Sequence, residues 1–280
     1  MDRGGFALGV GSVAGALHTA MGRPNQDACW WRRTEDTLCL CVCDGCGSGA
    51  HSEVGAQLGA RLAVEAVLAQ VAGRCPDEGQ AVLDHDVVAV ALAAAREAVL
   101  VSLRSLAAAL GPDLGATAET FFLFTLVGAV VTPHTTAVFS VGDGTIALNG
   151  ALTRLGPFLQ NAPPYLGHSL LDPCIAVMQA PNAVALHHVA PTEEVRSILL
   201  ATDGADALER HAATPLPGTD EPLGPLARFW EDPRYVDHPD LLRRWLARAN
   251  RRTSTSRGLL GDDTTVAVIR RRDPEEDADA

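Results

Sequence analysis

Residues 38–49 read Leu-Cys-Leu-Cys-Val-Cys-Asp-Gly-Cys-Gly-Ser-Gly, an apolar run that passes directly into a carboxylate and a glycine-rich turn. The apolar half is typical of a buried strand, and Asp44-Gly45 is typical of the turn that ends one. Apolar residues at helical spacing then predict a helix over 52–71. We therefore expect the fold to contain a buried strand, a sharp turn and a long helix in succession.

The rest of the chain contains both helical and strand-like patterns. A second helix is predicted over 84–110, where Gly111-Pro112 ends it. Stretches 120–132 and 135–141 are rich in β-branched and aromatic residues and predict a hairpin. Further strands are predicted at 145–149, 151–155, 175–179, 183–187, 197–202 and 264–270, and late helices at 223–230 and 239–250. Many short strands with two adjacent long helices indicate an α+β fold, with antiparallel sheets and helices packed outside.

The composition narrows the class of protein. The 280 residues are 47% apolar, which is enough for a sizeable core, and no apolar run reaches membrane-spanning length. The first residues lack the pattern of an export signal, so we expect a cytoplasmic protein. The formal net charge of −12 argues against nucleic acid or an anionic membrane as a partner. We expect one domain over 1–272 and a disordered acidic tail over 273–280.

Lysine is absent, since all 22 basic residues are arginine. This excludes mechanisms that need a lysine amine, such as a P-loop, a Schiff base or a Ser-Lys pair.

Several aspartates follow apolar strands directly. A single Asp-Gly pair is usually a plain turn. A repeated pattern is harder to explain by turns, and gathered carboxylates favour a hard divalent cation, which prefers oxygen ligands. The pattern therefore predicts a carboxylate metal site. Its members are Asp44-Gly45, Asp143-Gly144, Asp203-Gly204 and Asp262-Asp263, with Asp27 as a fifth acidic position.

Five sequence blocks, in order, resemble the motifs of the type 2C (metal-dependent) protein phosphatases, and especially their divergent bacterial branch. The resemblance runs from about Gly9 to Arg271. It implies a four-layer α-β-β-α sandwich with a central antiparallel β-sandwich and a dinuclear metal site at one end. The blocks are 23–27, 44–49, 141–144, 201–204 and 262–266.

The resemblance implies a set of metal ligands. Asp44 would bridge two Mn²⁺ or Mg²⁺ ions, and the carbonyl of Gly45 would bind the second ion. Asp203 and Asp262 would hold the first ion. Asp143 would serve a third, looser ion.

The resemblance also implies an activity. Asp27 would hold metal-bound waters and Arg23 would grip the substrate phosphate. The expected reaction is hydrolysis of phosphoserine or phosphothreonine by a metal-activated water. The expected partner is a phosphorylated protein, such as one from a Ser/Thr kinase pathway.

Three positions depart from the family pattern and keep other functions open. Gln26 stands where most relatives have Glu, Arg23 lies one residue closer to the aspartate, and Cys46 replaces a histidine of animal relatives that is thought to act as general acid. One alternative is a catalytically inactive pseudophosphatase that acts as a binding or regulatory module. Another is hydrolysis of a small phosphorylated metabolite.

Other motifs have simpler interpretations. Residues 9–14 match a dinucleotide-binding fingerprint, and Asp27 lies at a plausible distance for its acid, but Gly22-Arg23-Pro24-Asn25 is not the strand that should carry that acid. Cys43-x-x-Cys46 lacks a second pair for zinc. Cys39, Cys41 and Cys43 alternate along a strand and are expected to pack in the core in reduced form. His187-His188 are expected to be ordinary polar residues, and the solvated face of a helix is expected to carry Arg243, Arg244, Arg248, Arg251 and Arg252.

Overall fold

The structure is a computed structural model that describes residues 5–72, 82–171, 183–238, 240–254 and 256–272. It divides into two units, each with one five-stranded sheet. Unit 1 comprises Met1–Asn25, Thr145–Thr153 and Val195–Ala280, and unit 2 comprises Gln26–Gly144 and Arg154–Glu194. Two antiparallel sheets with helices confirm the predicted α+β class. The predicted strand 175–179, the tail 273–280, Cys75 and Cys174 lie outside the described residues.

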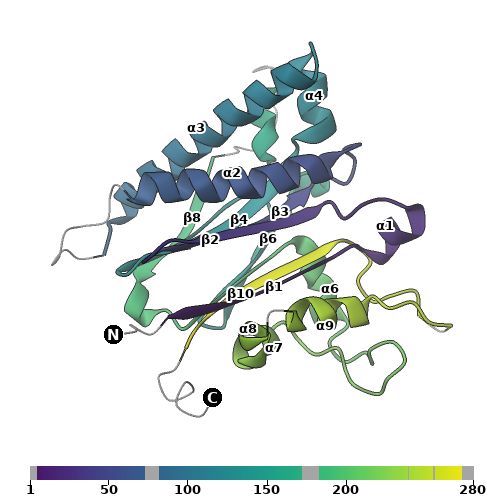
Figure 1. Ribbon diagram of the computed structural model, residues 1–280. Helices are drawn as coiled ribbons and strands as arrows, with labels where there is room; N and C mark the ends of the chain where they lie inside the picture. The colour runs from purple at the N-terminus through teal and green to yellow at the C-terminus, as the bar shows by residue number, and fades with distance from the viewer. Residues whose placement is uncertain (1–4, 73–81, 172–182, 239, 255, 273–280) are drawn as a thin grey trace. The chain divides into compact units, whose positions relative to one another are not determined.

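The sheet of unit 2 has the strand order β2-β3-β4-β5-β8. Figure 1 shows α2 and α3 side by side over one face of this sheet. The strands are β2 (Asp27–Arg33), β3 (Leu38–Gly45), β4 (Phe124–Val131), β5 (Thr135–Val141) and β8 (Ala185–Pro191). The helices are α2 (Ser52–Ala72), α3 (His85–Leu110) and α4 (Leu114–Phe121), with short 3₁₀ turns η1 (Leu159–Asn161), η2 (Leu166–Leu170) and η3 (Thr192–Glu194).

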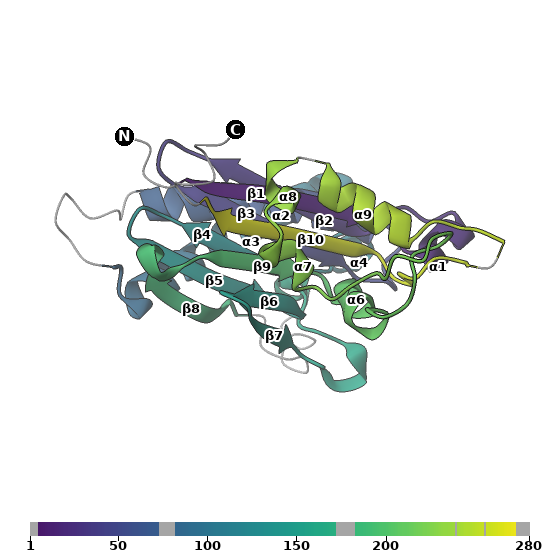
Figure 2. The ribbon, with the colours of Figure 1, turned by 90° about the horizontal axis from the view of Figure 1, so that it is seen from below.

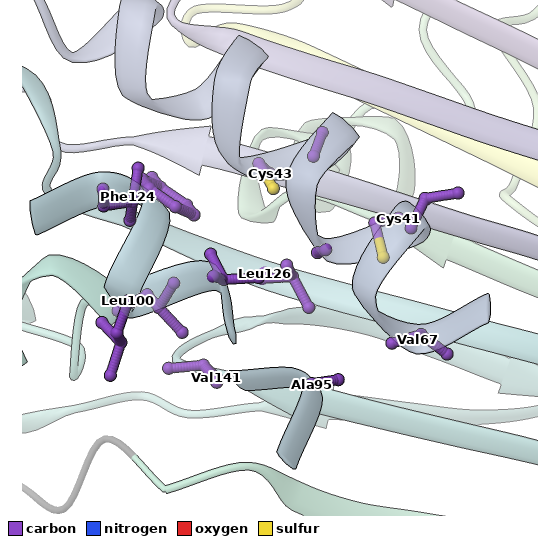
Figure 3. Packing of buried hydrophobic residues seen from close by; sticks show 14 of the residues in the cluster. Cys41, Cys43, Val67, Ala95, Leu100, Phe124, Leu126 and Val141 are labelled. Atoms are coloured by element: carbon purple, nitrogen blue, oxygen red, sulfur yellow. The ribbon is translucent and has the colours of Figure 1, made fainter. Parts of the chain in front are cut away.

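The core of unit 2 lies between the sheet and its helices. Cys39, Cys41 and Cys43 alternate along β3 and point into this core, as their spacing predicts. Figure 3 shows Cys41, Cys43, Phe124 and Leu126 among the packed side chains. Phe124 is fully buried, and Gly59 of α2 lies so close to its ring that an added Cβ would overlap it. A small residue at position 59 therefore lets α2 approach the sheet.

The sheet of unit 1 has the strand order β1-β10-β9-β6-β7 (Figure 2). Its core joins apolar residues of β1, β6, β9 and β10 to those of α6, α7, α8 and α9. The strands are β1 (Phe6–Val13), β6 (Gly144–Leu148), β7 (Ala151–Leu155), β9 (Ser197–Ala201) and β10 (Thr264–Arg271). The helices are α1 (Ala16–Met21), α6 (Asp206–Arg210), α7 (Arg228–Glu231), α8 (Arg234–Asp237) and α9 (Leu241–Ala249), with η4 (Asp203–Ala205).

The glycines of the fingerprint at residues 9–14 serve packing. They lie within β1, which contacts α8 and α9. A Cβ on Gly9 would overlap the carbonyl oxygen of Tyr235, and a Cβ on Gly11 would lie 2.8 Å from the backbone nitrogen of Arg243. Both glycines therefore allow helices to approach the strand closely. Their role in packing accounts for the glycines without a nucleotide site.

Other expectations needed correction. The predicted strand 120–132 was too long, because α4 continues to Phe121 and β4 begins at Phe124. The predicted helix 223–230 is mostly loop and begins as α7 at Arg228. The sequence patterns did not predict β1, β2, α1, α4, α6 or α8. None of the described helices combines the length and apolar character needed to cross a membrane.

Candidate functional site

Two of the predicted site carboxylates face each other across neighbouring strands. Asp27 begins β2, Asp44 lies near the end of β3, and the two are direct partners in the antiparallel register. Directly opposite residues point to the same face of a sheet, and like charges in that position are unfavourable. Asp27 is only 5% exposed. A bound cation would neutralise the pair.

The turn that follows Asp44 is held tightly. A Cβ on Gly45 would lie 2.8 Å from the carbonyl oxygen of Gln26 and 2.9 Å from that of Ser52, so only glycine fits there. The side-chain amide of Gln26 donates to Ser52 Oγ over 2.7 Å, and that hydroxyl donates to the carbonyl of Cys46 over 2.9 Å. Gln26 therefore supports the turn, where a glutamate would add a third negative charge.

Tyr165 is a site residue that the motifs did not reveal. Burial, a hydrogen bond with Cys46 and the nearby charges of Cys46, Asp44 and Asp143 raise the pKa of its phenol far above the ordinary value. The hydroxyl is a protonated donor at neutral pH, as in any tyrosine of ordinary or raised pKa, and it feels the charges of two of the predicted ligands. The one sequence signal was its position in the long Pro- and Gly-rich loop 156–173, which is of the kind that often carries function.

In unit 1, the structure brings two predicted ligand loops together. Asp203 begins η4, and a Cβ on Gly204 would overlap the carbonyl oxygen of Asp263. The Asp203-Gly204 turn therefore lies directly against the Asp262-Asp263 segment. Asp262 is exposed, and its Oδ1 accepts a hydrogen bond from the backbone of Asp263 over 2.9 Å.

Asp263 has a different setting from its neighbour Asp262. It is 3% exposed, and its carboxylate accepts a hydrogen bond from the Gly15 backbone over 2.6 Å and pairs with His18 Nδ1 over 2.8 Å. The backbone N–H of Arg23 in turn donates to the carbonyl of His18 over 2.9 Å. Asp263 therefore anchors α1 and the start of the segment that carries Arg23, a role that the Asp-Asp sequence did not reveal.

The donor set fits a hard divalent cation. Every predicted ligand is a carboxylate or a backbone carbonyl, as Mg²⁺ and Mn²⁺ prefer. Asp27, Asp44, Gly45 and Asp143 belong to unit 2, whereas Arg23, Asp203 and Asp262 belong to unit 1. Within the described ranges, no group of three or more His, Cys, Asp or Glu side chains is arranged to hold a metal ion. The ligand set thus stays a prediction from the motifs, supported by the opposed Asp27 and Asp44.

The remaining candidate motifs, the histidine pair and the arginine cluster, make ordinary structural contacts. His187 lies on β8, where Nε2 is 2.9 Å from Ser140 Oγ, and burial lowers its pKa. The five arginines expected on a helix face are all exposed. Arg243, Arg244 and Arg248 lie on α9, whereas Arg251 and Arg252 follow its end at Ala249, so the helical placement of these two was wrong. Arg243 and Arg248 make ion pairs with Asp240 and Glu221.

The strand cysteines should resist alkylation in the folded protein. Burial raises the pKa of Cys29 to about 12 and that of Cys43 well above its usual range, while a hydrogen bond with Cys39 and burial do the same for Cys41. At pH 8 we expect iodoacetamide to modify Cys43, which is fully buried, far more slowly in the folded than in the urea-unfolded chain, because thiolate is the reactive form. Mass-spectrometric peptide mapping measures both rates, and equal rates would contradict this assignment.

Comparisons with known proteins agree with the motifs. The family model described as protein phosphatase 2C matches residues 14–248. No curated protein sequence matches the chain.

Similar solved structures include serine-threonine phosphatase 2C from Toxoplasma gondii, with 15% identity, 95% of each chain covered and a TM-score of 0.59. A serine/threonine phosphatase from Staphylococcus aureus has 14% identity, 98% of each chain covered and a TM-score of 0.53. A variant of a bacterial serine phosphatase has 14% identity and a TM-score of 0.52, covering 96% of this chain and 100% of its own. At such low identity these likenesses show a shared fold.

Proposed function

Because the chain belongs to the protein phosphatase 2C family, we propose that it is a metal-dependent phosphatase that hydrolyses phosphoserine and phosphothreonine in proteins. The observation that carries this proposal is the direct opposition of Asp27 and Asp44 across β2 and β3. Two carboxylates directly opposite on one sheet face repel each other, and a bound cation would offset that repulsion. Their placement therefore supports retention of the metal site.

The proposed ligands are those of the motif blocks, with Asp44 as the bridge between two ions. When bound, Mn²⁺ or Mg²⁺ supplies Lewis acidity and a water of lowered pKa. The β2–β3 pairing fixes the direction of the Asp27 and Asp44 carboxylates. Gly45 presents its carbonyl from a turn that Ser52 and Gln26 hold in place. The full proposed set is Asp27, Asp44, Gly45, Asp203 and Asp262, with Asp143 for a third, looser ion.

Arg23 and Tyr165 are the side chains proposed to contact the substrate phosphate. Arg23 carries a fixed positive charge suited to a phosphoryl oxygen. Tyr165 offers a protonated hydroxyl close to Asp44 and Asp143, beside Cys46. We propose that it donates a hydrogen bond to the phosphate or its leaving oxygen, the task that Cys46 is poorly suited to perform.

Tyr165→Phe tests this role. We expect kcat to fall by about tenfold to a hundredfold, because the ring remains but the hydroxyl donor is lost. The Mn²⁺ affinity of the variant should equal that of the wild-type protein within experimental error, since Tyr165 is not a proposed ligand. Steady-state kinetics and calorimetric titration separate the two effects. Unchanged kcat on both an aryl phosphate and a phosphopeptide would remove Tyr165 from the mechanism.

The function itself is tested with purified full-length protein. Hydrolysis of p-nitrophenyl phosphate and of a phosphothreonine peptide should require Mn²⁺ or Mg²⁺ and stop with EDTA. The matching calorimetric experiment measures Mn²⁺ binding without substrate. Binding without turnover would favour the pseudophosphatase alternative, and absence of both would exclude the proposed metal chemistry.

A substrate screen distinguishes a protein phosphatase from a metabolite phosphatase. Both use the same chemistry, so the difference is read from kcat/KM. We expect kcat/KM to be higher for phosphopeptides than for small phosphorylated metabolites. The reverse order would retain the mechanism and replace the substrate class.

A further inference from the structure

The two edges of the unit 2 sheet differ in how open they are to further pairing. Edge strands usually carry a bulge, a proline or another interruption, because a regular edge presents unpaired N–H and C=O groups. The β8 edge has a register shift opposite Val138/Phe139 and ends at Pro191. At the other edge, β2 pairs with β3 at seven consecutive positions without a shift and contains no proline. Within the described part of the sheet, β2 is therefore a regular edge strand with no second strand beside it.

The outer half of β2 also exposes large side chains. Trp30 is 39% exposed and Trp31 is 49% exposed, and Arg32 and Arg33 are exposed as well. Successive strand residues point to opposite faces, so Trp30 and Arg32 share one face and Trp31 and Arg33 share the other. Two neighbouring indoles on an open edge leave considerable apolar surface in water.

We propose that β2 is the interface for a second copy of this chain, through antiparallel pairing of two β2 strands about a two-fold axis at Trp31. In this register the two Trp31 side chains face each other at the axis. Arg32 lies opposite the partner's Trp30, and Arg33 lies opposite the partner's Cys29. The two-fold axis makes the Arg32–Trp30 and Arg33–Cys29 pairs twice, as a self-complementary interface requires.

The Arg32–Trp30 pairing has a counterpart within the chain. The Arg61 guanidinium lies 5.1 Å from the centre of the Trp30 ring, on the face of β2 that α2 covers. Trp30 therefore already accepts a cation, and a second guanidinium from the partner would add to that interaction. Arg32 also forms an ion pair with Glu65 of α2, which holds its side chain on the same face.

Neighbouring registers are less favourable. An axis at Arg32 would place two guanidinium groups opposite each other, which is repulsive. An axis at Trp30 would engage Asp27, which is buried and belongs to the proposed metal site. The axis at Trp31 avoids both. Because the strand supplies its own complement in this register, a second copy fits the edge better than an unrelated strand.

Solution mass tests the proposal independently of metal or activity. Sedimentation velocity of the wild-type protein over a series of concentrations should show a species of twice the 29.4 kDa chain mass. Trp31→Arg should abolish that species, because it places like charges at the axis. The control Val101→Arg changes an exposed apolar residue on α3 and should leave the dimer intact. A monomeric wild-type protein, or a Trp31→Arg variant that stays dimeric with an unchanged circular dichroism spectrum, would overturn the proposal.

A cysteine variant tests the register. Opposed residues in antiparallel strands have Cα atoms about 4.5–5.5 Å apart, within disulfide range. Mild oxidation of Trp31→Cys should therefore give a covalent dimer on a non-reducing gel, while Val101→Cys and the wild-type protein should not. A Trp31→Cys dimer in solution that fails to cross-link would exclude pairing at this axis.

Discussion

Asp44→Asn is expected to lower the phosphatase kcat by about a hundredfold or more, the largest loss from any single carboxylate. Asp44 is the proposed bridge, so the substitution removes negative charge from both metal positions. Without metal, the variant should melt no lower than the wild-type protein, because the like charge opposite Asp27 is removed. Added Mn²⁺ should raise its melting temperature less than that of the wild-type protein.

The matched control for this prediction is Asp86→Asn. Asp86 lies in the first turn of α3, and its side chain is almost fully exposed. The same change of charge there should leave kcat and the Mn²⁺-dependent rise in melting temperature unaltered. Near wild-type activity in Asp44→Asn, with the same Mn²⁺ response, would show that the bridging assignment is wrong.

Phe124→Ala is expected to lower the free energy of unfolding by about 3–5 kcal/mol, the usual loss for an aromatic side chain deleted from a tight core. Phe124 is fully buried at the start of β4 and contacts α2 at Gly59. The glycine cannot fill the space that the ring leaves. Urea titration followed by circular dichroism measures the change, with Val101→Ala on the exposed face of α3 as control. A loss below about 1 kcal/mol would mean that the core closes over the cavity.

The strongest sequence patterns predicted the elements that they describe. The apolar run at 38–43 and the helical spacing at 52–71 correspond to β3 and α2, since β3 is buried on both faces and α2 packs an apolar side into the core. The family motifs located Asp27 and Asp44, and the structure shows why they belong together: the register of β2 with β3 places them opposite each other. That pairing is a tertiary property that neither local segment expresses.

Other parts of the fold and of the candidate site could not be predicted, because their local sequence patterns are weak. β1 carries Gly9 and Gly11, whose low strand preference is outweighed by helices that pack closely on its backbone. Tyr165 comes under the electrostatic influence of Asp44 and Asp143 through the path of a long loop, and loop paths are not encoded by periodicity. Asp263 looked equivalent to Asp262 until its contacts with His18 and Gly15 were seen. In each case the deciding contact joins residues that are distant in sequence.

The pairing of β1 with β10 bears on the order in which the protein can fold during synthesis. Ser12 of β1 and Thr265 of β10 are hydrogen-bonded partners separated by 253 positions, and β10 also lies between β1 and β9. A ribosome therefore releases β1 long before its partner exists. The residues of β2 to β5, by contrast, emerge within one continuous stretch of chain. Unit 2 can accordingly begin folding early, whereas the sheet of unit 1 must wait for the last strand, and β1 remains available to chaperones or to wrong partners until then.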